Sequence, residues 1–90
     1  GFFARRMVSL VYGGLPDASF EEACADYRAA LELEERLVHH FELGRTLLEM
    51  NRPGSAREHL RRAIAMPQRD VTDPIYKERA RRLLQEMNRP

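Results

Sequence analysis

A pattern of small and apolar residues recurs in this chain at a spacing of 33 residues. Within each copy the residues lie four and three positions apart, which is the spacing of one face of an α-helix. The matching residues are Ala23, Tyr27 and Ala30 in the first copy and Ala56, Leu60 and Ala63 in the second. A second echo at 36 residues equates Gly44 with Ala80, Leu47 with Leu83 and Leu48 with Leu84. Repeats with a period of about 20 to 50 residues are typical of stacked units, so the chain is predicted to contain repeated helix-turn-helix units.

Apolar residues follow the helical period along the whole chain, and no segment shows the alternation of a strand. The chain is therefore predicted to be all-α, a single domain over residues 1–90. About five helices are expected, over residues 2–12, 19–33, 35–50, 55–66 and 73–87, with the last as an unpaired capping helix. Ser19 and Glu22 are predicted to form a capping box at the start of the second helix. Thr72 or Asp73 is expected to be the N-cap before Pro74.

Composition excludes some classes of partner. The 15 basic and 14 acidic residues leave a net charge of +1, whereas nucleic-acid-binding domains are usually strongly basic. No apolar run approaches the roughly 18 residues that a membrane-spanning helix needs, so membrane insertion is not expected. The amino-terminal aromatic residues precede the arginines, the reverse of the order in a signal peptide. The single cysteine indicates no compartment, and a cytoplasmic location is favoured.

Histidine and cysteine, the usual residues of metal and nucleophilic sites, form no recognisable motif here. His39 and His40 are adjacent, so on a helix they point about 100° apart and not toward one metal ion. His40 is instead predicted to pack in an aromatic slot, and His59 to lie at the surface. Cys24 lies on an alanine-rich helix face, outside any known nucleophile motif. We therefore expect no enzyme activity, no metal and no cofactor.

The third and fourth predicted helices resemble the tetratricopeptide repeat, in which a helix with the pattern W-x2-L-G-x2-Y is followed by one with A-x3-F. The residues that carry the resemblance are His40, Leu43, Gly44 and Leu47, then Ala56, Leu60, Ala63 and Pro67. His40 replaces the tryptophan and Leu47 the tyrosine. Gly44, Ala56 and Ala63 are expected to let the two helices approach closely, with Leu47 and Leu60 between them. The resemblance implies an α-solenoid.

A narrower resemblance is to the C-terminal repeats of the regulator of microtubule dynamics proteins. Four segments carry it: "FELGRTLLEMN", "AREHLRRAIAMP", "RDVTD" and "ERARRLL". This resemblance implies a scaffold and adds no catalytic residue.

The tetratricopeptide resemblance also implies a binding groove, because the first helix of each repeat lines the concave face of such arrays. The corresponding residues are Phe41, Arg45, Lys77 and Arg81, with Val8 and Tyr12 one repeat earlier. An aromatic end and a basic end suit a peptide with a hydrophobic anchor and an acidic residue or a C-terminal carboxylate. The groove lacks the asparagines with which some relatives bind chaperone tails, so that partner is not expected.

Two functions follow from these expectations. The first is a protein-protein interaction scaffold that binds a peptide in the groove. The second is a packing or self-association module, a homo-oligomer or one piece of a longer repeat array, since at least three repeats are generally needed for stability.

Overall fold

The computed structural model describes residues 17–89, which contain four α-helices and no strand. The helices are α2 (Asp17–Leu33), α3 (Leu37–Glu49), α4 (Pro53–Ala65) and α5 (Asp73–Met87). The helix predicted over residues 2–12 lies outside the described residues. No helix in the described part of the chain is long and apolar enough to cross a membrane.

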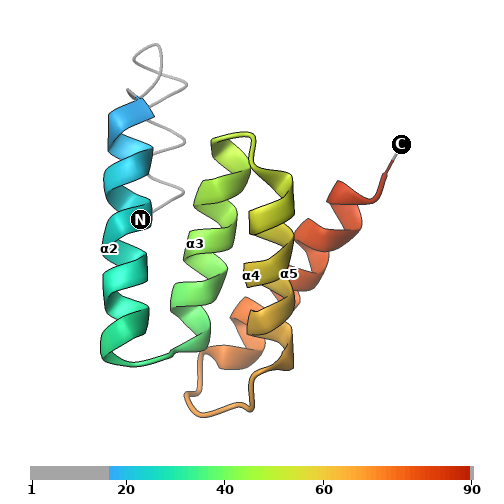
Figure 1. Ribbon diagram of the computed structural model, residues 1–90. Coiled ribbons are helices and arrows are strands. Elements are labelled where there is room, and N and C mark those ends of the chain that lie inside the picture. Colours follow the sequence, from blue (N-terminus) through green and yellow to red (C-terminus); the bar gives the residue numbers. More distant parts are fainter. Residues whose placement is uncertain (1–16, 90) are drawn as a thin grey trace.

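Short connections place successive helices side by side in opposite directions (Figure 1). Among the described helices, α3 is central and packs against α2, α4 and α5, whereas the backbone of α2 lies close only to that of α3. α5 lies behind α4 and crosses it at an angle (Figure 1). The turn at residues 34–36 and the loop at residues 66–72 therefore lie at the same end of the bundle, which we call the base.

The four described helices begin and end within two residues of the bounds predicted for them, but the predicted capping box is wrong. Helix α2 begins at Asp17, so Ser19 lies inside the first turn. An N-cap residue must precede the first helical residue, so Ser19 is not the N-cap.

The turn between α3 and α4 is a Schellman motif. Asn51 adopts a φ of 58°, a left-handed conformation that asparagine tolerates better than most residues. The Arg52 N–H donates to the Leu47 carbonyl at 3.0 Å, and the Asn51 N–H donates to the Leu48 carbonyl at 3.0 Å. Pro53 then begins α4, at a position where its missing N–H leaves no helical hydrogen bond unmade.

The core consists of two groups of buried side chains on either side of the α3–α4 contact. One group lies between α3, α4 and α5 and contains Leu37, Phe41, Leu60, Ala63, Met66 and Ala80. The other lies between α2, α3 and α4 and contains Cys24, Leu43, Leu47 and Ala56. Of the predicted repeat positions, Ala23, Gly44, Leu47, Ala56, Leu60, Ala63 and Ala80 are buried, and Tyr27, Ala30 and Leu83 are half-buried.

Gly44 shows how closely α3 and α4 approach each other. A Cβ atom at this position would lie 2.9 Å from Leu60 Cγ and 3.2 Å from the Ala56 carbonyl oxygen. Both distances are shorter than ordinary van der Waals contacts. The close approach of α3 and α4 that was predicted at Gly44 is therefore present in the structure.

Candidate protein-interaction surface

Phe41 and Arg45, the α3 residues predicted to line the groove, are largely interior. The Phe41 ring is 1% exposed and belongs to the core. The Arg45 guanidinium lies over that ring, with Cζ 5.2 Å from the ring centroid, and its Nη2 is 3.1 Å from Glu42 Oε2. Only 15% of the Arg45 side chain is exposed, and this burial lowers its pKa while Glu42 opposes the shift. Phe41 is therefore a core residue under the Arg45 side chain, and the charge of Arg45 is already paired with the Glu42 carboxylate.

Tyr76 and Arg79 of α5 extend this aromatic cluster to the surface. The Tyr76 ring lies 5.4 Å from the Phe41 ring, tilted by 49°. The exposed Arg79 places its guanidinium carbon 5.4 Å from the centroid of the Tyr76 ring. Residues three apart on a helix share a face, and an arginine over an aromatic ring is held by a cation–π interaction. The sequence analysis missed Arg79, although its spacing from Tyr76 was a usable signal.

A shallow hollow of about 380 Å³ follows the outer face of α5. We call its lining the α5 ledge: Pro74, Ile75, Glu78, Arg79 and Arg82. Ile75 is 51% exposed although it is a large apolar residue. Two arginines and one glutamate give the ledge a net positive charge. Glu78 lies 3.7 Å from Arg82, in a solvent-exposed ion pair that contributes little to stability.

Lys77 and Arg81, the predicted groove residues of α5, do not line the ledge. Lys77 is half-buried, and its positive charge acts on Asp73 at the start of α5. Arg81 is exposed, with Nη1 3.9 Å from Glu78 Oε2. Val8 and Tyr12 lie outside the described residues. A binding role for any of these residues stays a prediction.

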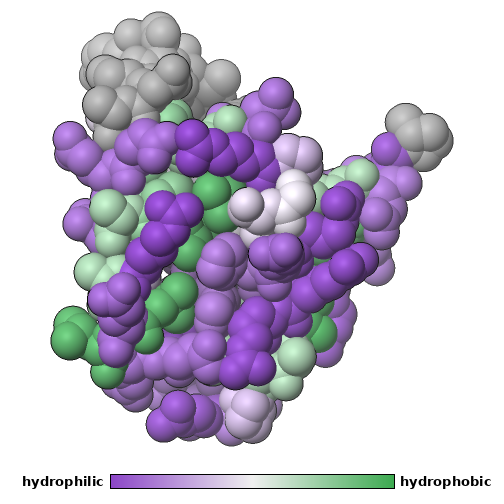
Figure 2. Space-filling view, in the orientation of Figure 1, coloured by the Kyte–Doolittle hydropathy of each residue, from purple (hydrophilic) through white to green (hydrophobic). Residues whose placement is uncertain are grey.

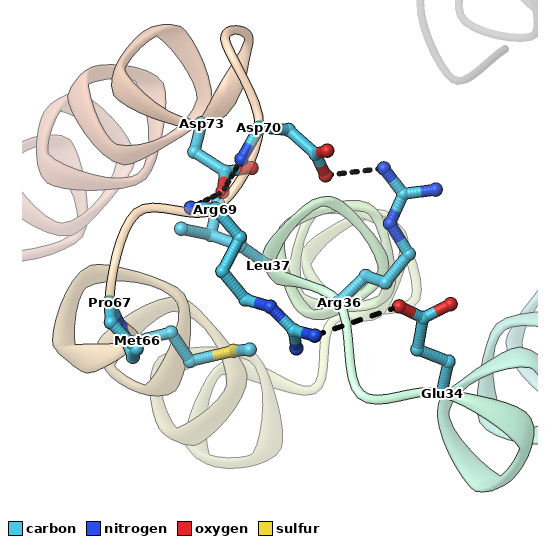
Figure 3. A pocket seen from close by; sticks show the side chains of 8 residues that line it. All are labelled: Glu34, Arg36, Leu37, Met66, Pro67, Arg69, Asp70 and Asp73. Carbon is cyan, nitrogen blue, oxygen red and sulfur yellow. Dashed lines mark hydrogen bonds and ion pairs between the residues drawn. The ribbon is translucent and has the colours of Figure 1, made fainter.

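The base of the bundle contains a second hollow of about 380 Å³, shown in Figure 3. Its lining combines the apolar Leu37, Met66 and Pro67 with the charged Glu34, Arg36, Arg69, Asp70 and Asp73. Arg36 pairs with Asp70, and Arg69 Nη2 lies 4.0 Å from Glu34 Oε1 (Figure 3). These pairs join the α2–α3 turn to the α4–α5 loop. The charged groups of this hollow thus pair with one another, and the arrangement fits a structural role.

Asp73 fixes the backbone of the α4–α5 loop. Its buried carboxylate accepts the backbone N–H groups of Asp70 at 3.0 Å and Arg69 at 2.8 Å. These two hydrogen bonds lower the pKa of Asp73, since they stabilise the charged form. Thr72 is the N-cap of α5 and makes no side-chain capping bond. The alternative prediction, that Asp73 is the N-cap, is wrong. Asp73 is the first helical residue, and its carboxylate binds the preceding loop.

His40 packs in the interior, as predicted, but the prediction that His59 is a surface residue is wrong. The two rings are stacked, with centroids 5.3 Å apart, and the His59 side chain is half-buried.

Among the described residues, no cluster of three or more potential ligands could hold a metal ion. Cys24 is fully buried with Sγ 3.5 Å from Met50 Sδ, and burial raises its pKa, which disfavours the reactive thiolate.

The hydropathy of the visible surface differs between its two sides. Figure 2 shows hydrophilic side chains gathered over α4 and α5, and hydrophobic side chains exposed around the lower end of α2. Leu33, the last residue of α2, is 90% exposed, and Val71 in the loop before α5 is 92% exposed.

Comparison with known protein families identifies one match over nearly the whole chain. Residues 1–88 match the family described as regulator of microtubule dynamics protein 1-3. No curated protein and no solved structure matches the chain. The match confirms the narrower of the two resemblances seen in the sequence, and the chain belongs to the regulator of microtubule dynamics protein 1-3 family.

Proposed function

We propose that this chain is a non-catalytic protein-interaction module whose α5 ledge holds an acidic segment of a partner protein. The observation that carries the proposal is the placement of Arg79. Its guanidinium is held over the Tyr76 ring, beside the exposed Ile75 and a second arginine, Arg82. The family name concerns the regulation of microtubule dynamics, and a protein partner is compatible with that name.

The chemistry of the ledge favours carboxylates next to an apolar side chain. Arginine presents a planar set of donors that fits a carboxylate with two parallel hydrogen bonds. Because Tyr76 and the buried Phe41 support Arg79, less side-chain freedom remains to be lost on binding. Ile75 supplies an apolar contact whose burial adds affinity.

We also propose that α3, α4 and α5 form one and a half repeats of a tetratricopeptide-type array. The packing of α3 against both α4 and α5 supports this proposal, as does the close approach at Gly44. In such arrays α3 and α5 are equivalent first helices, and partners bind along the face that they share. Arg79, whose charge acts on Arg45 of α3, would then lie at the edge of that face.

Charge reversal of the ledge tests the proposed function. We expect Arg79→Glu combined with Arg82→Glu to weaken binding of a peptide rich in aspartate and glutamate, with one leucine, by at least about tenfold. Each charge-assisted hydrogen bond contributes about 1.5–3 kcal/mol, and about 1.4 kcal/mol corresponds to a tenfold change in Kd. Fluorescence anisotropy of the labelled peptide at low and high salt provides the measurement.

The matched control is Arg28→Glu combined with Arg61→Glu, which makes the same change in net charge at exposed positions of α2 and α4. This control should bind nearly as tightly as the unmodified chain. Equal weakening by both double variants would show that only net charge matters, and would contradict a site on α5. A second peptide, with asparagine and glutamine in place of the acids, should not bind.

The exposed apolar residues at the base favour a second candidate, self-association. Leu33 and Val71 each adjoin a residue of the base hollow, Glu34 and Asp70 respectively, so both lie at the same end of the bundle. If this end is an interface between copies, sedimentation velocity should show a dimer at micromolar concentration that Leu33→Ser with Val71→Ser converts to a monomer. An unmodified chain that stays monomeric at every concentration would eliminate this candidate.

A further inference from the structure

Two histidines on neighbouring helices meet through their ring nitrogens. His40 of α3 and His59 of α4 place their Nδ1 atoms 3.0 Å apart, within hydrogen-bond distance. The rings are stacked with an angle of 28° between their planes. His40 is 7% exposed and His59 is half-buried, so water has little access to the His40 ring. We call these two residues the histidine pair.

The other nitrogen of His40 is bound by a carboxylate. His40 Nε2 donates to Glu35 Oε2 at 3.0 Å, and Arg62 pairs with the same carboxylate. The hydrogen bond from Arg62 is the main reason why the pKa of Glu35 is lowered to about 2, with a further contribution from the His40 bond. Glu35 therefore stays ionised across the range in which histidine titrates, and its carboxylate can only accept in the hydrogen bond with His40 Nε2.

Counting protons shows which charge states permit the contact. One proton lies between the two Nδ1 atoms, and the nitrogen that does not carry it must accept with its lone pair. The contact therefore holds when the pair is neutral or carries one positive charge. When both rings are protonated, two N–H groups face each other with no acceptor between them, and two like charges lie side by side.

The surroundings oppose the second proton. Burial lowers the pKa of His59, and the positive charges of His40 and of Arg28 on α2 lower it further. Glu58, on α4 itself, acts weakly in the opposite direction. Glu35 is already paired with Arg62, so its carboxylate offsets little of the charge of a doubly protonated pair.

We propose that the histidine pair is a pH-sensitive latch between α3 and α4, closed at neutral pH and opened by the second proton in mildly acidic solution. Because the latch joins the two helices that pack around Gly44, its opening loosens the central contact of the bundle.

The sign of the pH dependence follows from proton binding. An unfolded histidine binds its proton around pH 6.5, whereas folded His59 binds it only at lower pH. Between these two values the unfolded state holds more protons, so stability falls as pH decreases below about 6.5 and stops falling below the folded pKa. Above about pH 6.5 the contribution of His59 to the free energy of unfolding is fully present.

Chemical denaturation at a series of pH values, with His59→Asn, tests the latch. The asparagine amide keeps a hydrogen-bonding group near the Nδ1 position but does not titrate. We expect unfolding of the unmodified chain to take up additional protons as the pH falls below about 6.5, and unfolding of the variant to take up markedly fewer. The control His39→Asn removes the one histidine outside the pair and should retain the pH dependence. Equal pH dependence in the unmodified chain and His59→Asn would overturn the proposal.

A second measurement on the unmodified chain does not depend on the folding of a variant. Ring resonances followed by NMR should show the pair taking up its two protons in separate steps, with the second step below the pH of the first. The α3 and α4 amide signals should change with the second step. Two steps that coincide near pH 6.5, with no change in the helices, would also overturn it.

Discussion

Replacing Leu60 with alanine is expected to lower the free energy of unfolding by about 2–5 kcal/mol. Leu60 is fully buried where α3, α4 and α5 meet, among the largest side chains with no exposed surface. Its removal leaves a cavity that the closely packed helices cannot fill by moving together. A domain of this size is stabilised by only about 5–15 kcal/mol, so a large part of the total would be lost.

Urea denaturation followed by circular dichroism measures this loss. Leu33→Ala is the matched control, because the same side chain is removed from a position that is 90% exposed. It should change the free energy of unfolding by less than about 0.5 kcal/mol. Similar values for the two variants would mean that Leu60 is not a core residue in solution.

Gly44→Val is expected to lower the free energy of unfolding by about 3 kcal/mol. Its Cβ would have to lie within 3.2 Å of the Ala56 carbonyl oxygen and closer still to Leu60, so the two helices must separate. Gly54→Val is the control, since a Cβ at Gly54 would meet nothing within 4 Å. Differential scanning calorimetry should show a lower Tm for the first variant only.

A double variant isolates the contact itself. In the Leu60→Ala background the atoms nearest to the new side chain are absent, so Gly44→Val should then cost less than it does alone. Strict additivity of the two changes would contradict the view that Gly44 is needed for the close approach to Leu60.

The helices could be predicted from the sequence because their signals are local. The periodic apolar residues of α5, with Pro74 in its first turn, give bounds that agree with the observed Asp73–Met87. The packing around Gly44 and Ala56 was also predictable, because small residues at helical spacing have few other uses in a core. These features depend on residues close together in the sequence.

The capping residues were not predictable, because the same polar side chain can bind several backbone partners. Ser19 has the residue type of an N-cap but lies two residues inside α2. Asp73 has the same character, yet its carboxylate binds the N–H groups of Arg69 and Asp70 in the preceding loop. The backbone partner of Asp73 depends on the conformation of the loop between α4 and α5.

The sequence could not show how far each predicted groove residue of α3 and α5 is buried. The repeat at 36 residues equates Arg45 with Arg81. This equivalence does not show whether either side chain is buried. In the structure Arg45 is held by Glu42 over the Phe41 ring, whereas Arg79 reaches the surface over Tyr76. The His40–His59 contact was missed for the same reason, since it joins two helices whose relative rotation no local pattern specifies.

Chemical-shift mapping of the isotope-labelled chain during titration with the acidic peptide tests whether α5 binds the peptide. We predict that the perturbed amides and arginine side chains lie along α5 at residues 74–82, with Arg79 and Arg82 among the largest changes and the Tyr76 ring shifted with them. Perturbations confined to α2 or to the base, at residues 34–36 and 66–72, would contradict a binding surface on α5.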